Sequence, residues 1–281
     1  MPDIDRLLRT LHRAIQAFAA TPGRIGHTIQ LNDADEVLAA GDLHGNIDNF
    51  RRLLARAELG LRPRRHLVLQ ELIHGPFHYP NDGDKSHQLV DLVAALKCER
   101  PEQVHLLLGN HELAQWQGEW IAKGDAELSQ SFLDGVNTAY GPRSAEIYDA
   151  YIRLFAHAAL AVCTSNRVFL SHSMPSRRRF QSFDVRVLEQ EELEPQHLAM
   201  GGAVHSLLWG RDTAQETAGA FLKLVNADLL ITGHIPCERG FAAPNDRQLI
   251  VDCMGAPAAY CLFPANRPLT HEELLSCVGI L

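Results

Sequence analysis

Two short segments place groups that can bind a metal or move a proton directly after apolar runs. Their sequences are Gly-Asp-Leu-His-Gly-Asn at 41–46 and Gly-Asn-His-Glu at 109–112. Asp42 and His44 stand two residues apart at the end of an expected strand, so their side chains point the same way. A carboxylate and an imidazole so placed form half a site for a divalent metal. Asn110 offers a neutral oxygen ligand, and the adjacent His111 would project differently and could act as an acid or base. Each segment alone also fits a tight turn that caps a helix.

Two more histidines follow apolar runs further along the chain. His172 stands in Leu-Ser-His-Ser (170–173), and His234 stands in Thr-Gly-His-Ile (232–235). A single histidine after a strand is usually a structural or surface residue. Four polar strand ends in one chain instead indicate one shared site, because ligands of open α/β sheets collect where strands end and loops begin.

The elements that must position these residues read as alternating strands and helices. Strand-length apolar runs occur at 36–40, 66–69, 103–108, 167–170, 228–231 and 248–251. Amphipathic stretches of helical length occur at 46–58, 86–97, 144–157 and 213–225, and a further helix is expected over 3–19. This alternation predicts an α/β layered core. The long polar stretches 74–88 and 173–200 are expected to be functional or mobile loops.

The composition excludes several classes of function. Of the 281 residues, 26 are Lys or Arg and 34 are Asp or Glu, so the formal net charge is −8. An acidic chain is poorly suited to broad adhesion to nucleic acid or to an anionic membrane. No apolar run is long enough to span a bilayer, and the charged N-terminus has no signal-peptide core. The six cysteines form no C-x-x-C pair and fit buried thiols in a reducing compartment. We therefore expect a cytoplasmic protein.

Taken in order, the motifs resemble those of the calcineurin-like metallophosphoesterases, and within them the serine/threonine phosphoprotein phosphatases. That family's pattern is G-D-x-H-G, G-D-x-V-D-R-G, G-N-H-E, a strand-ending His, and G-H. This sequence matches four of the five as GDLHGN, GNHE, LSHS and GHIP, between about residues 36 and 263. Leu207-Leu208-Trp209-Gly210 is similar to the family's L-L-W segment. The resemblance implies a four-layer α/β/β/α sandwich of two mixed sheets, the metallo-dependent phosphatase fold. We expect a single domain over 1–281, with an N-terminal helix within 1–22.

The resemblance also implies two divalent metal ions. Asp42 and His44 would hold one, while Asn110, His172 and His234 would hold the other, with one carboxylate bridging the pair. Such a pair can lower the pKa of a bridging water and clamp the attacking and leaving oxygens of an in-line displacement. His111 would protonate the leaving alkoxide as general acid. Mixed nitrogen and oxygen ligands suit Mn, Fe or Zn.

The second motif departs from the family pattern. The segment 70–76 reads Gln-Glu-Leu-Ile-His-Gly-Pro, so Glu71 occupies the place of the bridging Asp. His74 and Gly75 stand where the family has the Asp that orients the catalytic His and the Arg that grips phosphate. If 72–83 is an insertion, Asp84 and Lys85 could replace that pair. The alternative is an ordinary loop in which Ser86 caps the following helix.

Two arginines are further candidates for binding substrate. Arg211 follows the Leu-Leu-Trp segment, and Arg177 begins an arginine run just after the motif of His172. The run also fits a solvated surface.

The resemblance implies hydrolysis of phosphate monoesters, with a phosphoprotein as the first expectation for the substrate. One alternative is a dinucleoside polyphosphate hydrolase or phosphodiesterase that uses the same metal centre. The other is a non-catalytic, metal-binding pseudophosphatase, suggested by the altered second motif. The expected partners are a phosphorylated protein or a small phosphoester, and neither nucleic acid nor a membrane.

Overall fold

The computed structural model describes residues 3–118, 122–123 and 126–281. Its core holds a five-stranded sheet in the order β14-β13-β3-β4-β5. Strands β3 (Glu36–Asp42), β4 (Arg65–Gln70) and β5 (Val104–Leu107) are parallel. Strands β13 (Ala259–Pro264) and β14 (Val278–Ile280) are added antiparallel at one edge.

The second sheet has seven strands in the order β1-β2-β8-β9-β10-β12-β11. Its members are β1 (Arg24–Ile25), β2 (Thr28–Leu31), β8 (Ala161–Thr164), β9 (Val168–Ser171), β10 (Leu229–Thr232), β12 (Gln248–Val251) and β11 (Phe241–Ala242). Strand β10 runs parallel to both β9 and β12, while β8 is antiparallel to β9. Both sheets are therefore mixed, as expected.

The two sheets pack face to face through alternate residues of their strands. Val37, Ala39 and Val68 of the first sheet join Leu170 and Ile231 of the second in one buried apolar cluster. The intervening residues, such as Leu38 and Leu67, belong to a different cluster shared with the helices. Because side chains alternate along a strand, each sheet buries one face against the other sheet and one against helices.

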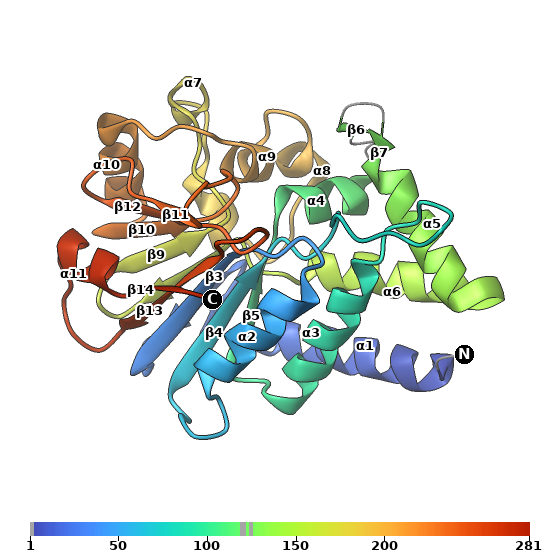
Figure 1. The fold of residues 1–281 in the computed structure, drawn as a ribbon. Helices are drawn as coiled ribbons and strands as arrows, with labels where there is room; N and C mark the ends of the chain where they lie inside the picture. The colour runs from blue at the N-terminus through green and yellow to red at the C-terminus, as the bar shows by residue number, and fades with distance from the viewer. Residues whose placement is uncertain (1–2, 119–121, 124–125) are drawn as a thin grey trace.

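Helices cover the outer face of each sheet (Figure 1). On the five-stranded sheet lie α2 (Ile47–Ala57) and α3 (His87–Glu99), with α1 (Ile4–Ala19) packed against α3 and against α6 (Ser144–Ala156), and on the seven-stranded sheet lies α10 (Gln215–Leu224). The remaining elements are α4 (Asn110–Gln117), α5 (Leu128–Tyr140), α7 (Arg177–Phe180), α8 (Pro195–Leu198), α9 (Ala203–Leu208), α11 (His271–Ser276), the ribbon β6 (Ala122–Lys123) and β7 (Ala126–Glu127), and 3₁₀ turns at 141–143 and 185–188. The layers follow the expected α/β/β/α order.

The six expected strands and five expected helices all form, with ends that differ by at most two residues. The predicted set did not include helix α5 or several strands, among them β2, β8 and β13. The polar stretch 173–200 holds the short elements α7 and α8. Across the described residues, no helix combines the length and apolar character needed to cross a membrane.

Candidate metal centre and its cleft

The predicted ligands meet at one edge of the two sheets. Asp42 ends β3, Glu71 follows β4, and Asn110 begins α4 after β5, while His172 and His234 follow β9 and β10. These strands present their carboxyl ends to the same edge, and a bridge between Asp42 and Asp252 joins the sheets there. Ligand atoms of Asp42, Glu71 and His172 all lie within 4.8 Å of one another.

His172 stands at the centre of the group, fully buried. Its Nε2 is 2.9 Å from Asn110 Oδ1, 3.0 Å from Glu71 Oε2 and 3.2 Å from His234 Nδ1. One ring nitrogen thus faces three atoms from three other segments of the chain.

The other nitrogen of His172 decides what Nε2 can do. Nδ1 lies 2.9 Å from the side-chain oxygen of Gln70 and donates a hydrogen bond to it. Nε2 then carries a lone pair and faces the lone pairs of Glu71 and Asn110. Burial lowers the pKa of His172. Burial also lowers the pKa of His234, to about 2. Both rings are therefore disfavoured as cations, and protonation does not relieve this crowding of acceptors. A cation does, and these donors fit a divalent transition metal.

The other half of the centre is built from Asp42 and His44. His44 adopts a left-handed backbone conformation (φ 43°), and its Nδ1 donates to the carbonyl of Ile73 at 2.8 Å. This bond leaves Nε2 as the free ligand atom. Asp42 accepts the backbone N–H of His234, and burial raises its pKa to about 6. Burial and the neighbouring Asp42 also raise the pKa of Glu71. Buried carboxylates without a cationic side chain fit bound metal ions.

Glu112 is a third buried carboxyl group beside Asp42 and Glu71, and its role was not evident from the sequence. It accepts the backbone N–H groups of Leu72 at 2.7 Å and Ile73 at 3.2 Å, and so holds the loop that follows Glu71. Burial and the charge of Glu71 raise its pKa to about 8. A Cβ atom on Gly109 would collide with the carboxylates of both Glu71 and Glu112, which explains the glycine there. The Gly-Asn-His-Glu motif at 109–112 contains both Gly109 and Glu112, so the sequence held the residues from which this role of Glu112 could have been inferred.

An open cleft of about 500 Å³ leads to these residues. Its polar floor includes Asp42, His44, Asn110, His111 and His234, and its apolar walls include Pro76, Leu128, Trp209, Pro236 and Met254. Arg211 also lines the cleft, and its Nη1 donates to the carbonyl of His234 at 3.1 Å. His111 is mostly buried, and burial with the surrounding imidazoles holds its pKa well below the usual range.

Three of the sequence-predicted site residues do not make the contacts that were expected of them. Lys85 is not among the described residues that line the cleft, and its Nζ lies 5.0 Å over the ring of Tyr79. Arg177 does not line the cleft either, and its backbone N–H donates to Asp212. Asp84 is buried and contacts Ser86 and His74, and within the described part of the chain it makes no hydrogen bond to His111. The loop 72–83 therefore returns Asp84 toward the site but leaves Lys85 outside it.

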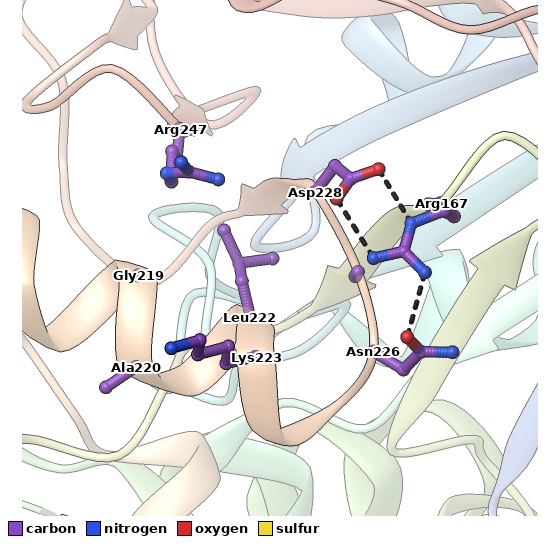
Figure 2. A pocket seen from close by; sticks show the side chains of 9 residues that line it. Arg167, Gly219, Ala220, Leu222, Lys223, Asn226, Asp228 and Arg247 are labelled. Carbon is purple, nitrogen blue, oxygen red and sulfur yellow. Dashed lines mark hydrogen bonds and ion pairs between the residues drawn. The ribbon is translucent and has the colours of Figure 1, made fainter.

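A second pocket, of about 470 Å³, is lined by residues other than those of this centre (Figure 2). Arg167 there makes two hydrogen bonds to Asp228 and one to Asn226, and Lys223 and Arg247 complete its basic lining. Arg167, Asp228 and Arg247 precede β9, β10 and β12, whereas His172 and His234 follow β9 and β10. The pocket thus lies at the opposite edge of the sheet and shares no residue with the candidate metal centre.

The chain is similar to a known protein family and to curated proteins. The profile of the calcineurin-like phosphoesterases matches residues 36–238. Serine/threonine-protein phosphatase 5 of Arabidopsis thaliana is 24% identical over 264 residues, which cover 84% of this chain and 44% of that protein. The Homo sapiens protein of the same name is 23% identical over 273 residues, covering 86% and 49%. The chain thus spans about half the length of the curated relatives that it matches.

Solved structures share the fold at low sequence identity. A Saccharomyces cerevisiae protein serine/threonine phosphatase, described as similar to human phosphatase PP5, superposes with a TM-score of 0.70 at 15% identity, covering 100% of this chain and 89% of that one. A cold-active protein-tyrosine phosphatase of a psychrophilic Shewanella gives a TM-score of 0.62 at 16% identity, covering 94% and 84%. These likenesses concern the fold alone.

Proposed function

The chain belongs to the calcineurin-like phosphoesterase family, and from that premise we propose that it hydrolyses phosphate monoesters with two divalent metal ions. The observation that carries the proposal is the environment of His172, whose Nε2 faces Asn110 and Glu71 within 3.0 Å. Buried acceptors gathered around one point need a cation at that point. His44 and Asp42 provide the ligands of a neighbouring position, with Glu71 between the two.

When bound, the metal ions would polarise the phosphoryl oxygens and activate the attacking water. The protein's own residues supply the remaining functions. Arg211 lines the cleft beside the metal ligands and would bind the phosphate oxygens. His111 would give its proton to the leaving oxygen as the ester bond breaks. We expect His111 to carry this proton when the phosphate dianion is bound, because a nearby negative charge favours the charged imidazolium.

We propose a phosphorylated protein side chain as the substrate. The cleft is open, and its apolar walls at Pro76, Trp209 and Met254 would contact the residues that flank a phosphorylated side chain. Curated relatives are named as serine/threonine-protein phosphatases, which supports the same class.

The test is turnover of p-nitrophenyl phosphate by the metal-stripped protein with and without added Mn²⁺. We expect activity that requires metal and is lost in His172→Ala. His78→Ala is the matched control, because His78 is exposed and its Nδ1 contacts the carbonyl of Pro76 in its own loop. Phosphoserine, phosphothreonine and phosphotyrosine peptides are then compared with a dinucleoside polyphosphate and a phosphodiester. Preference for the last two would replace the phosphoprotein by a small-molecule substrate, and metal binding without any turnover would indicate a pseudophosphatase.

A further inference from the structure

His74 links a buried carboxylate to the proposed general acid. The residue follows Glu71 in the altered second motif, adopts a left-handed backbone conformation (φ 63°), and its side chain is 1% exposed. Its Nδ1 lies 3.7 Å from Asp84 Oδ2, and its ring meets the ring of His111 edge to face with centroids 5.0 Å apart. Phe132 packs against another side of the same ring. His74 thus contacts both Asp84 and His111.

Both imidazoles carry a buried nitrogen that lacks a partner. Within the described residues, His111 Nδ1 and both ring nitrogens of His74 make no hydrogen bond. Buried polar atoms without a partner are costly, so two adjacent ones favour pairing with each other.

Two other histidine pairs in this protein serve as references for the distance between the rings of His74 and His111. His66 and His105 have ring centroids 5.2 Å apart and are joined by an N···N contact of 2.9 Å. His172 and His234 have centroids 4.9 Å apart and an N···N distance of 3.2 Å. The 5.0 Å between His74 and His111 falls between these values, so a turn of the rings can bring two nitrogens within hydrogen-bond range.

Asp84 favours the tautomer of His74 that can accept a hydrogen bond from His111. Its carboxylate accepts hydrogen bonds from the N–H and the hydroxyl of Ser86, each at 2.7 Å. Burial alone would raise the pKa of Asp84, but the nearby imidazole of His74 and the hydrogen bonds from Ser86 hold it below its usual value. An anionic Asp84 beside Nδ1 of His74 favours a proton on that nitrogen and a lone pair on Nε2.

We propose that His74, held by Asp84, positions His111 by accepting the hydrogen bond from its Nδ1–H. The inference rests on the proposed function. It assigns a positioning role to the residue that stands in place of a carboxylate in the family pattern. In the reaction, water forms the new P–O bond while the bond to the leaving oxygen breaks. The Nε2 proton of His111 passes to that oxygen, and the protons of the attacking water leave with the phosphate product. The Nδ1 proton stays on His111, hydrogen-bonded to His74, and His111 regains its Nε2 proton from solvent.

The experiment compares two phosphate esters whose leaving groups differ in how much they need a proton from a general acid. Phenyl phosphate has a poor leaving group and depends on general acid catalysis, whereas p-nitrophenyl phosphate depends on it much less. His74→Phe keeps a packed ring but removes both nitrogens, and His74→Asn keeps an acceptor and tolerates the left-handed backbone. We expect His74→Phe to lower kcat/KM for phenyl phosphate by ~10²-fold and for p-nitrophenyl phosphate by ~10-fold or less. His74→Asn should recover part of the loss.

A second variant, Asp84→Asn, and nitrogen NMR test the same contact without relying on His74→Phe. Asp84→Asn can still accept from Ser86 and should weaken phenyl phosphate turnover selectively, even if His74→Phe fails to fold. NMR of ring-labelled histidine in the metal-free protein should place a proton on His111 Nδ1 in the wild type and change this tautomer in the variants. Equal losses for both esters, together with an unchanged His111 tautomer, would overturn the positioning role. An inactive wild type with metal bound would instead overturn the proposed function, while the tautomer measurement would still decide the contact.

Discussion

His172 donates a hydrogen bond from Nδ1 to the side-chain oxygen of Gln70 at 2.9 Å, across 102 positions of sequence. The contact joins the end of β9 to the end of β4, so it connects the two sheets. It also sets the tautomer that leaves Nε2 of His172 free as a ligand. Gln70 is itself held by a 3.0 Å hydrogen bond from its amide to the carbonyl of Ala40.

Replacing Gln70 should therefore weaken metal binding. Gln70→Met keeps a side chain of similar length but removes the acceptor, and loss of such a supporting partner typically costs ~10–100-fold in metal affinity. Gln70→Glu keeps an acceptor and should lose less. Competition with a chromophoric chelator measures the affinities, and equal affinities for the two variants would contradict the assigned role.

Glu71→Gln should abolish binding of at least one metal while the fold survives. The substitution keeps the size of the side chain but removes the negative charge that two nearby cations would share. Metal content of the purified protein and far-ultraviolet circular dichroism measure the two effects. Glu99→Gln is the control, because Glu99 has a largely exposed side chain at the end of α3. Full metal content in Glu71→Gln would remove Glu71 from the ligand set.

His111→Ala should lower turnover of a phosphoserine peptide by ~10²–10⁴-fold, the range for general acid catalysis. Metal content should stay near that of the wild type, because the His111 side chain is not assigned as a ligand. Loss of metal in this variant would instead make His111 part of the metal centre.

Two cationic side chains should differ in their effect on substrate. Arg211 lines the cleft, and Arg211→Ala should lower kcat/KM by about 10–100-fold, the cost of one charge-assisted hydrogen bond. Lys85 lies over the ring of Tyr79 instead, so Lys85→Ala should retain wild-type kinetics. A raised KM in Lys85→Ala would show that this side chain turns into the cleft when substrate binds.

In the metal-free protein, the stabilisation that Glu112 contributes should be lost as the pH rises from about 4.5 to 8. The pKa of Glu112 is raised to about 8 by burial and by Glu71, so the folded state binds this proton more tightly than the unfolded state does. The stabilisation is complete below the unfolded-state value and is lost as the pH passes the folded-state value, at up to about 1.4 kcal/mol per pH unit. Urea unfolding of chelator-treated protein at several pH values measures how the free energy of unfolding changes with pH. Relative to Glu112→Gln, the wild type should become less stable as the pH rises through this range. Identical slopes in both proteins would show that Glu112 does not titrate in this range.

The residues that we propose as metal ligands, and their order along the chain, were recognisable in the sequence. Apolar runs of strand length placed Asp42, Asn110, His172 and His234 directly after strands, because a backbone that alternates its side chains leaves a readable pattern. The layered α/β/β/α fold followed from that pattern and from the resemblance. Helix α1 was readable for the same reason, since its apolar positions recur at the helical period.

Only the tertiary structure decided which distant residues support these ligands. Gln70 and His172 meet because the two sheets pack face to face, and no local pattern records which side chains face each other across that interface. Glu112 lies against Glu71 because Gly109 leaves room for both carboxylates. His74, Asp84 and Lys85 depend on the path of the loop 72–83, which has no periodic pattern to fix its course. That path brings Asp84 to His74 and leaves Lys85 with Tyr79, because the direction of a loop side chain is set by the contacts the loop makes after the core has formed.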